Sequence, residues 1–275
     1  MTTNDGAASH DDGPGPEQRA GAPAHGLKVE LVVDADDLAD AFDCTCEAFG
    51  RQTKDGIWRH LTPGWDTPEG RERAVSLLVK RWRSTTTDDQ GRRNAIFLKA
   101  TLPIDSEGQQ PASTRALAGF AIWLQASAVP GYGDAPAADL RQAMDLEAMY
   151  PGDEAAQRYA CQIDASLHRQ RIQVVKDKAE GGAAPPAVMV LDICCVHPKF
   201  QGRGVGKALA KWGVDEARAR GIEAVTEASV MGRRVYEKLG FRQEGPEIVY
   251  DVDAEFADRE LPSNIFMRTG VLGET

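Results

Sequence analysis

The feature that most constrains this fold is an apolar run followed by a glycine-rich loop. Residues 188–196 read VMVLDICCV, and Asp192 is the one residue that interrupts the apolar character. A continuous run rich in β-branched residues is typical of a central strand covered on both faces. The run leads through a glycine loop into an amphipathic stretch over 204–220. We therefore predict a buried strand, a tight loop and a helix in that order.

The loop has the composition of an anion-binding turn. It reads Gln201-Gly202-Arg203-Gly204-Val205-Gly206-Lys207. A loop between a strand and a helix gathers free backbone N–H groups at the positive end of the helix dipole. Glycine permits positive φ and leaves no side chain to block a close approach. We expect the loop to bind a phosphate or pyrophosphate group, with the cations of Arg203 and Lys207 at its rim.

Two common phosphate-binding motifs do not fit these residues. A dinucleotide pattern G-x-G-x-x-G started at Gly202 requires glycine where Lys207 stands, and one started at Gly204 requires glycine at Leu209. The Walker A pattern requires glycine at Gln201 and a Ser or Thr at Ala208. Both nucleotide-binding motifs are therefore excluded.

The pattern that does fit is Q/R-x-x-G-x-G/A, formed by Gln201, Gly204 and Gly206 directly after an apolar strand. Here the sequence resembles the GNAT (Gcn5-related) acetyltransferase superfamily. A second block, VYEKLGF over 235–241, resembles that family's helix and turn and follows at the expected distance. Within the family, the segment FAIW at 120–123 and the Glu-Ala-Ser before the tyrosine are most similar to fungal GNAT proteins and puromycin-type acetyltransferases.

The resemblance implies an α/β layered fold in which a central mixed sheet is splayed between two parallel strands, 188–196 and 224–228, with helices on both faces. It also implies acetyl-CoA as cofactor and transfer of the acetyl group to a primary amine by direct attack in a ternary complex. Insertions able to cover the site favour a small-molecule amine as acceptor. A protein or peptide N-acetyltransferase and a non-catalytic acyl-CoA-binding protein are the alternatives.

The same resemblance assigns cofactor contacts. Backbone groups at the end of the central strand would hold pantetheine, with an oxyanion donor there, and the glycine loop would hold the pyrophosphate. Ser229 would bond pantetheine or cap the helix that follows it. The full expected set is Cys194, Cys195, Val196, Gln201, Gly202, Arg203, Gly204, Val205, Gly206, Lys207 and Ser229.

Three side chains are candidates for proton transfer. An alkylammonium has a pKa of about 10.4 and must lose a proton before it attacks. Glu227 and Asp192 are the candidate bases, and Glu227 is preferred because it closes its strand. The alternatives are an ion pair of Glu227 with Arg233 or Arg234 and a hydrogen bond that Asp192 accepts from a neighbouring loop or covering helix. Tyr236 is the proton donor that the resemblance implies, and packing or cofactor bonding is its alternative role.

Composition excludes several other classes. The net charge of -10 repels phosphate backbones, so nucleic acid is not an expected ligand. The five cysteines lack Cys-x-x-Cys spacing, which favours reduced thiols in a cytoplasmic protein over disulfides or a metal site. Cys194 and Cys195 are expected to be small core residues rather than nucleophiles. No apolar stretch reaches the ~18 residues of a membrane span.

We predict a disordered tail over 1–25 and a single domain over 26–275, with loop insertions near 103–114 and 126–186, in a monomer or homodimer. Within that domain, a helical cover is expected over 137–176 and an aromatic loop over 58–65, whose tryptophans line a pocket or belong to the core. Further strands are expected at 27–33, 95–100, 116–124 and near 247–252, and further helices at 34–49, from 67 and at 233–239.

Overall fold

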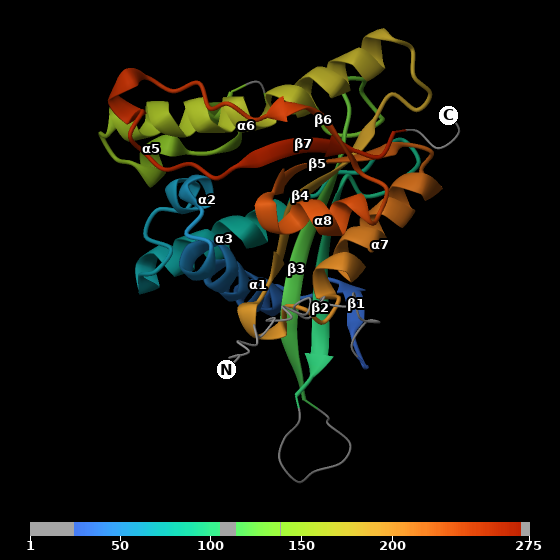
Figure 1. The fold of residues 1–275 in the computed structure, drawn as a ribbon, viewed down its shortest axis with the longest axis horizontal. Helices are drawn as coiled ribbons and strands as arrows, with labels where there is room; N and C mark the ends of the chain where they lie inside the picture. The colour runs from blue at the N-terminus through green and yellow to red at the C-terminus, as the bar shows by residue number, and fades with distance from the viewer. Residues whose placement is uncertain (1–24, 105–113, 138, 271–275) are drawn as a thin grey trace, which may run out of the picture.

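The computed structural model describes residues 25–104, 114–137 and 139–270, so almost all of the predicted tail and most of the 103–114 insertion lie outside the described residues. The described chain forms a seven-stranded sheet in the order β1-β2-β3-β4-β5-β7-β6 (Figure 1). The strands are β1 Lys28–Leu31, β2 Ala95–Pro103, β3 Arg115–Ala126, β4 Val188–Val196, β5 Glu223–Ser229, β6 Arg242–Glu247 and β7 Asn264–Arg268. Only the β4–β5 pair among these is parallel.

Helices cover both faces of this sheet. They are α1 Asp36–Thr45, α2 Gly56–Leu61, α3 Pro68–Arg83, α4 Leu140–Ala143, α5 Leu146–Met149, α6 Glu154–Glu180, α7 Val205–Ala219 and α8 Val230–Glu237. A π-helical turn, η1 Cys46–Gln52, continues α1, and a short 3-10 turn, η2 Pro198–Phe200, follows β4. Helices α7 and α8 cover one face, and α1, α3 and α6 cover the other (Figure 1).

Alternating strand residues supply the cores on the two faces. On the α7 face, Leu209 packs among Leu98 and Trp123, which are fully buried. On the opposite face, Leu38 of α1 packs against Phe120, and α6 packs on β4 and β5 through Val174 and its neighbours. The predicted layered α/β architecture with helices on both faces is confirmed.

A β-bulge in β4 lies at the centre of the sheet. Trp123 of β3 pairs with Leu191 and Ile122 pairs with Ile193, so Asp192 has no partner on β3. An extra residue of this kind bends its strand and re-aims the neighbouring side chains. Ordinary strand alternation places Asp192 on the α3 and α6 face with Val188 and Val190, and the bulge leaves Ile193 on that face as well. On this face Asp192 meets two arginines.

The parallel pairing of β4 and β5 is short. It begins at Val188 opposite Glu223 and ends at Leu191 opposite Thr226, where the Thr226 hydroxyl donates to the Leu191 carbonyl at 3.0 Å. Past this point β4 stays paired with β3, and β5 stays paired with β7. The two strands therefore part, as the splayed sheet requires.

Two sequence expectations were wrong. Trp58 lies in helix α2 rather than in an aromatic loop, because the Asp55 carboxylate caps that helix through the N–H groups of Ile57 and Trp58 at 3.0 and 2.9 Å. Its indole packs beside the Trp65 ring, with centroids 5.6 Å apart. The strand expected near 247–252 is β6, which ends at Glu247.

The strand that the sequence analysis missed is β7, which lies between β5 and β6. Its residues Ile265, Phe266 and Met267 are buried. Pro262-Ser263 precedes the run and Gly270 follows it, but three consecutive apolar residues are too few to predict a strand, so only its tertiary position identifies it as a central strand.

The predicted cover over 137–176 contains helices α4, α5 and α6. Helix α6 crosses the sheet near β5 and β7 and is capped by Asp153, whose carboxylate accepts from the Ala156 N–H at 2.9 Å (Figure 1). Its buried side chains include Tyr159, Ile163 and Arg171. No helix in the described ranges combines the length and apolar character needed to cross a bilayer.

The position of α7 depends on a glycine, which gives a test of the fold. A Cβ on Gly213 would lie 1.9 Å from the Trp123 indole, so Gly213→Ala must displace the helix or the ring. We expect a loss of about 2 kcal/mol in unfolding free energy, measured by urea denaturation. The control is Lys211→Ala on the exposed side of α7, which should change it by less than about 0.5 kcal/mol. Equal losses in both variants would contradict the packing.

Candidate functional site

The glycine loop presents a row of backbone N–H groups. Gly202 and Gly204 have φ of 75° and 81°, and Gly204 is the N-cap of α7 with no side-chain cap. The first bond into the helix runs from the Ala208 N–H to the Gly204 carbonyl at 3.0 Å. Within the described part of the chain, the N–H groups from Gly202 to Lys207 have no hydrogen-bond acceptor.

These residues fit a pyrophosphate. A Cβ on Gly202 would meet no atom within 4 Å, so the loop is open on its outer side. Val205 is buried, so it can offer only its N–H, whereas Arg203 and Lys207 are exposed. Free donors at a helix N-terminus, with cations beside them, are the chemistry that a diphosphate requires.

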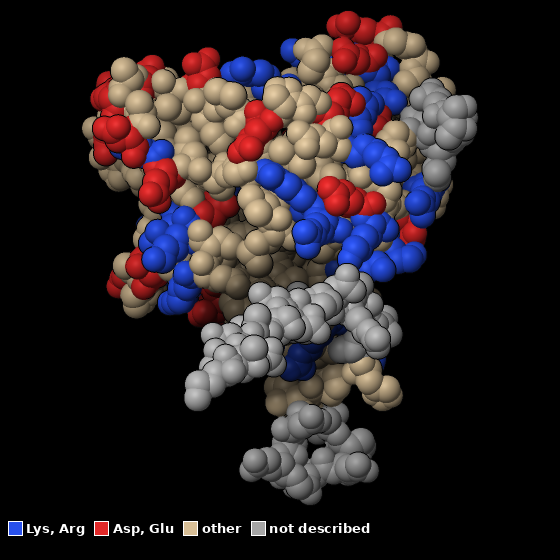
Figure 2. Space-filling model, viewed as in Figure 1, with Lys and Arg blue, Asp and Glu red and all other residues tan. Residues whose placement is uncertain are grey.

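The charge distribution agrees with that fit although the whole chain is acidic. Figure 2 shows Lys and Arg side chains gathered over α7 and α8 on this face of the molecule. The contributing residues of these two helices include Lys207, Lys211, Arg218, Arg233 and Arg234. Because Lys211 and Arg218 pair with Asp215 of the same helix, the positive field at the loop comes mainly from Arg203 and Lys207.

A glycine on the neighbouring strand lets α7 dock closely. A Cβ on Gly119 of β3 would lie 2.7 Å from Val205 Cγ1 and 2.8 Å from the Cys195 carbonyl oxygen. Sequence analysis did not single out Gly119, and a glycine inside an otherwise apolar strand was the available signal. It brings the helix N-terminus against the end of β4.

Gln201 anchors the loop. Its amide exchanges two hydrogen bonds with Gln52 of η1, at 2.7 and 2.9 Å, and its Nε2 donates to the Val196 carbonyl at 3.2 Å. Gln52 was missed because nothing in the local sequence pairs these two distant side chains. A direct contact of Gln201 with a cofactor stays a prediction.

The end of β4 borders the gap between the parted strands. Cys194, Cys195 and Val196 pair with β3 on one side, whereas the described part of β5 forms no pair with them on the other. Burial raises the pKa of the Cys194 thiol to about 12. The Cys195 thiol lies 3.7 Å from Cys44, and this contact and burial raise its pKa as well. Protonated, buried thiols are poor nucleophiles.

Tyr236 lies on the α7 and α8 side of the gap. Its ring is buried and packs beside Phe241, with centroids 5.7 Å apart. Burial raises the pKa of Tyr236 well above its ordinary value, and the neighbouring Cys194 thiol adds to the effect. A Cβ on Gly232 would lie 2.5 Å from the ring, so this glycine leaves room for it. The hydroxyl therefore keeps its proton beside β4.

Asp192 and Glu227 lie on the other side of the gap, joined by Arg171 of α6. Arg171 Nε donates to Glu227 Oε1 at 3.1 Å, its Nη2 donates to Glu227 Oε2, and its Nη1 donates to Asp192 Oδ1 at 2.9 Å. Arg81 of α3 donates to Asp192 Oδ2 at 2.8 Å. The partner of Glu227 is therefore Arg171, and not Arg233 or Arg234 as in the alternative to its catalytic role.

The arginines control the charge of this cluster. Burial acts to raise the pKa of Asp192, but Arg81 and Arg171 outweigh it and hold that pKa well below its usual range. Asp192 is therefore ionised and a weak proton acceptor at neutral pH. The side chains of Arg171 and Glu227 are 8% and 4% exposed, so their pairing is largely shielded from solvent.

Other polar groups near the gap were not found by sequence reasoning. The Tyr250 hydroxyl accepts a bond from Asn264 Nδ2 at 2.9 Å, and burial raises the pKa of Tyr250 to about 12. Asn264 lies opposite Ser229 on the paired strand. Ser229 itself is exposed and, contrary to one alternative, its hydroxyl does not cap α8. A bond from Ser229 to pantetheine stays a prediction.

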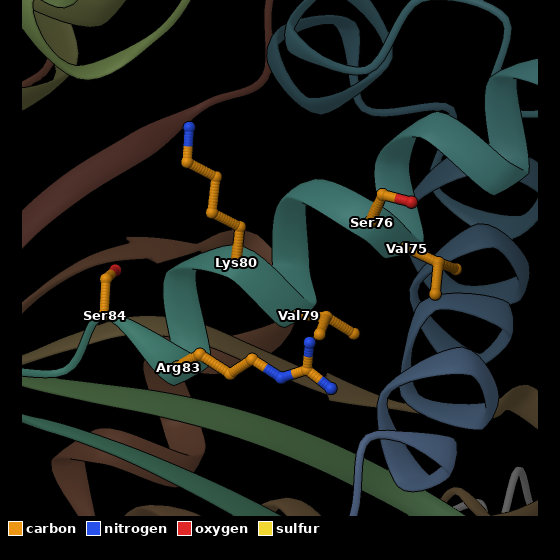
Figure 3. Close-up of a pocket in the computed structure, with 6 residues that line it drawn as sticks. All are labelled: Val75, Ser76, Val79, Lys80, Arg83 and Ser84. Atoms are coloured by element: carbon orange, nitrogen blue, oxygen red, sulfur yellow. The ribbon is translucent and has the colours of Figure 1, made fainter.

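Two surface hollows lie away from this site. One of about 560 Å³ is on helix α3, where Lys80 and Arg83 point in different directions (Figure 3). A second of about 300 Å³ lies between α6 and the segment before α4. Neither contains a loop residue or a candidate catalytic residue. Across the described ranges, no group of three or more His, Cys, Asp or Glu residues could hold a metal ion.

A family model matches the part of the chain that contains the candidate site. Residues 171–241 match the model of the acetyltransferase (GNAT) family, a range that includes the glycine loop and every candidate catalytic residue. No curated protein matches the chain. The matched family uses acetyl-CoA, and the match supports an N-acetyltransferase with that cofactor.

Solved structures establish the fold. Arylalkylamine N-acetyltransferase 2 from Aedes aegypti superposes with a TM-score of 0.52 at 17% identity, over 88% of this chain and 97% of that chain. A mosquito arylalkylamine N-acetyltransferase-like 5b protein gives 0.52 at 14% identity, over 88% and 98%. The chain has the GNAT fold.

Replacing Gly204 tests the loop as the cofactor site. Valine there places a Cβ at positive φ and in the approach path of a diphosphate, so coenzyme A binding should be abolished in calorimetric titration. Gly152→Val is the control, because Gly152 also has positive φ, 68°, but lies before α6. The control should bind as the unaltered protein does. Undiminished binding by Gly204→Val would refute the assignment.

Proposed function

We propose that this protein transfers the acetyl group of acetyl-CoA to a primary amine of a small molecule by direct attack in a ternary complex. The observation that carries the proposal is the parting of β4 and β5 after Leu191 and Thr226, with a loop of unbonded N–H groups where β4 ends. The GNAT fold and the family match over 171–241 support it.

The residues that would hold the cofactor follow from this geometry. The N–H groups from Gly202 to Lys207 would bind the pyrophosphate, and the free edge of β4 from Cys194 to Val196 would bond pantetheine. Bound acetyl-CoA supplies a thioester whose carbonyl carbon an amine can attack. A backbone N–H near Cys195 or Val196 would donate to the carbonyl oxygen as negative charge develops there.

Proton transfer is divided between the two sides of the gap. Tyr236 keeps its proton at neutral pH and can donate it to a leaving thiolate. Glu227 is bonded by one arginine and Asp192 by two, which favours Glu227 as the group that accepts the proton of the amine, directly or through water. Ser229, with its uncommitted hydroxyl, is proposed to contact pantetheine.

A covered site favours a small acceptor. One apolar cluster contains Ile57 of α2, Tyr159 and Ile163 of α6, and Phe256. Helices α2 and α6 and the chain after β6 therefore pack together on the α6 side of the gap. A protein substrate would need an open groove there. The two superposed mosquito proteins are named as arylalkylamine N-acetyltransferases, which agrees with a small amine. Closeness to fungal or puromycin-type members, a cytoplasmic location and a monomer or homodimer stay predictions.

An acceptor panel tests this proposal. The purified protein with acetyl-CoA should release free thiol in the presence of at least one small primary amine, with the acetylated amine identified by mass spectrometry. Basic peptides of matched amine concentration are the comparison. Faster acetylation of peptides than of every small amine would favour the protein acetyltransferase, and coenzyme A binding without any transfer would favour the non-catalytic alternative.

Tyr236→Phe tests the proton donor. The substitution removes only the hydroxyl, so we expect turnover to fall by about 100-fold while coenzyme A affinity in calorimetry stays nearly unchanged. Tyr250→Phe removes a buried hydroxyl that bonds Asn264 on the other side of the gap, and it serves as the control because turnover should stay close to that of the unaltered protein. Unchanged turnover in Tyr236→Phe would remove Tyr236 from this role.

A further inference from the structure

We propose that Arg171 is a positioning residue that bridges the two parted strands and sets the separation and orientation of the two candidate bases. The inference rests on the proposed function but concerns a residue that the reaction scheme does not itself use. Arg171 contacts Asp192 and Glu227 and lies on α6, outside the two central strands.

The place of the bridge is specific. Leu191 and Thr226 form the last pair of the parallel ladder, and Asp192 and Glu227 are the next residue of each strand. Asp192 is also the bulge residue, so it has no ladder partner on β3. Arg171 therefore supplies a side-chain link at the first position where the backbone link ends.

The chemistry of the link requires a guanidinium. Its Nε and Nη2 bond both oxygens of Glu227, while Nη1 reaches Asp192 Oδ1 at 2.9 Å. A planar guanidinium holds its donors in a fixed fork, whereas a lysine ammonium is a point charge on a flexible stem. Only the fork can fix the direction of one carboxylate relative to the other.

Several elements place charged groups around Asp192, Glu227 and Arg171. Asp192 of β4 faces Arg81 of α3 and Arg171 of α6, with His168 of α6 nearby. Around Tyr250, which packs on the Glu227 side, stand Asp55 and Glu247. Loss of Arg171 leaves two carboxylates with one arginine, so the affinity of the pair for a proton must rise.

The same helix provides a matched comparison. Lys178 of α6 bonds Glu223 of β5 at 2.9 Å, and Glu223 keeps a second cation, Arg268, as Asp192 keeps Arg81. At that position the strands are still paired, since Glu223 lies opposite Val188. Arg171 and Lys178 therefore both join α6 to β5, but only Arg171 does so where the strands part.

The experiment compares Arg171→Met, Arg171→Lys and Lys178→Met in the full chain. For each variant, the pH profile of kcat is measured with an accepted amine, and coenzyme A affinity is measured by calorimetry. In Arg171→Met, we expect the acid limb of the profile to move up by about 1 pH unit and kcat to fall by about 100-fold. Its coenzyme A affinity should weaken, because the gap that receives pantetheine loses its fixed width.

Lys178→Met should keep the acid limb and the coenzyme A affinity of the unaltered protein, whatever its thermal stability. Arg171→Lys retains the charge, so the acid limb should return toward its original position while kcat stays reduced. This variant also gives the answer if Arg171→Met does not fold.

Equal effects of Arg171→Met and Lys178→Met, or an unmoved acid limb in Arg171→Met, would overturn the positioning role. Full kcat in Arg171→Lys would overturn the need for the fork. Failure of the proposed function gives a different result, because the unaltered protein would then acetylate no small amine, whether or not it binds coenzyme A.

Discussion

The end of the parallel ladder at Leu191 and Thr226 is the constraint on which the site depends. Each strand keeps its other neighbour, so β3 and β7 hold the two edges of the gap apart while the backbone groups facing it stay unpaired. Unpaired backbone groups inside a protein need a partner. In the proposed function, an extended cofactor arm that bonds like an added strand would meet that need, and the loop at the end of β4 would receive its charged end.

The gap also separates two kinds of chemistry. Tyr236 lies on the α8 side in an apolar surrounding, where burial keeps its hydroxyl protonated. Asp192 and Glu227 lie on the α6 side among arginines, where attraction outweighs burial for Asp192 and keeps it ionised. The two environments differ because Tyr236 reaches the gap from helix α8 on one face of the sheet, whereas Asp192 and Glu227 project from β4 and β5 toward α6 on the other.

Local signals in the sequence were enough for the centre of the fold. The apolar run over Val188–Val196, the glycine loop and α7 have the expected bounds within a residue or two, because burial on both faces and a glycine N-cap act on neighbouring residues. Strand β7 and Arg171 could not be found this way. The roles of both depend on segments that are far away in the chain. Arg171 is one of many polar residues in α6, so nothing in the local sequence distinguishes it.

Burial of the Arg171 cluster argues for function over stability. Taking charges out of water costs several kcal/mol for each ion, and a well-made pair only roughly offsets this cost. Well-packed apolar side chains would join α6 to β5 at least as firmly, as Val174 already does a turn away. Such contacts are non-directional, however, and cannot orient a carboxylate. A charged bridge at the first unpaired position of both strands is therefore better explained by what it holds in place than by the free energy it contributes.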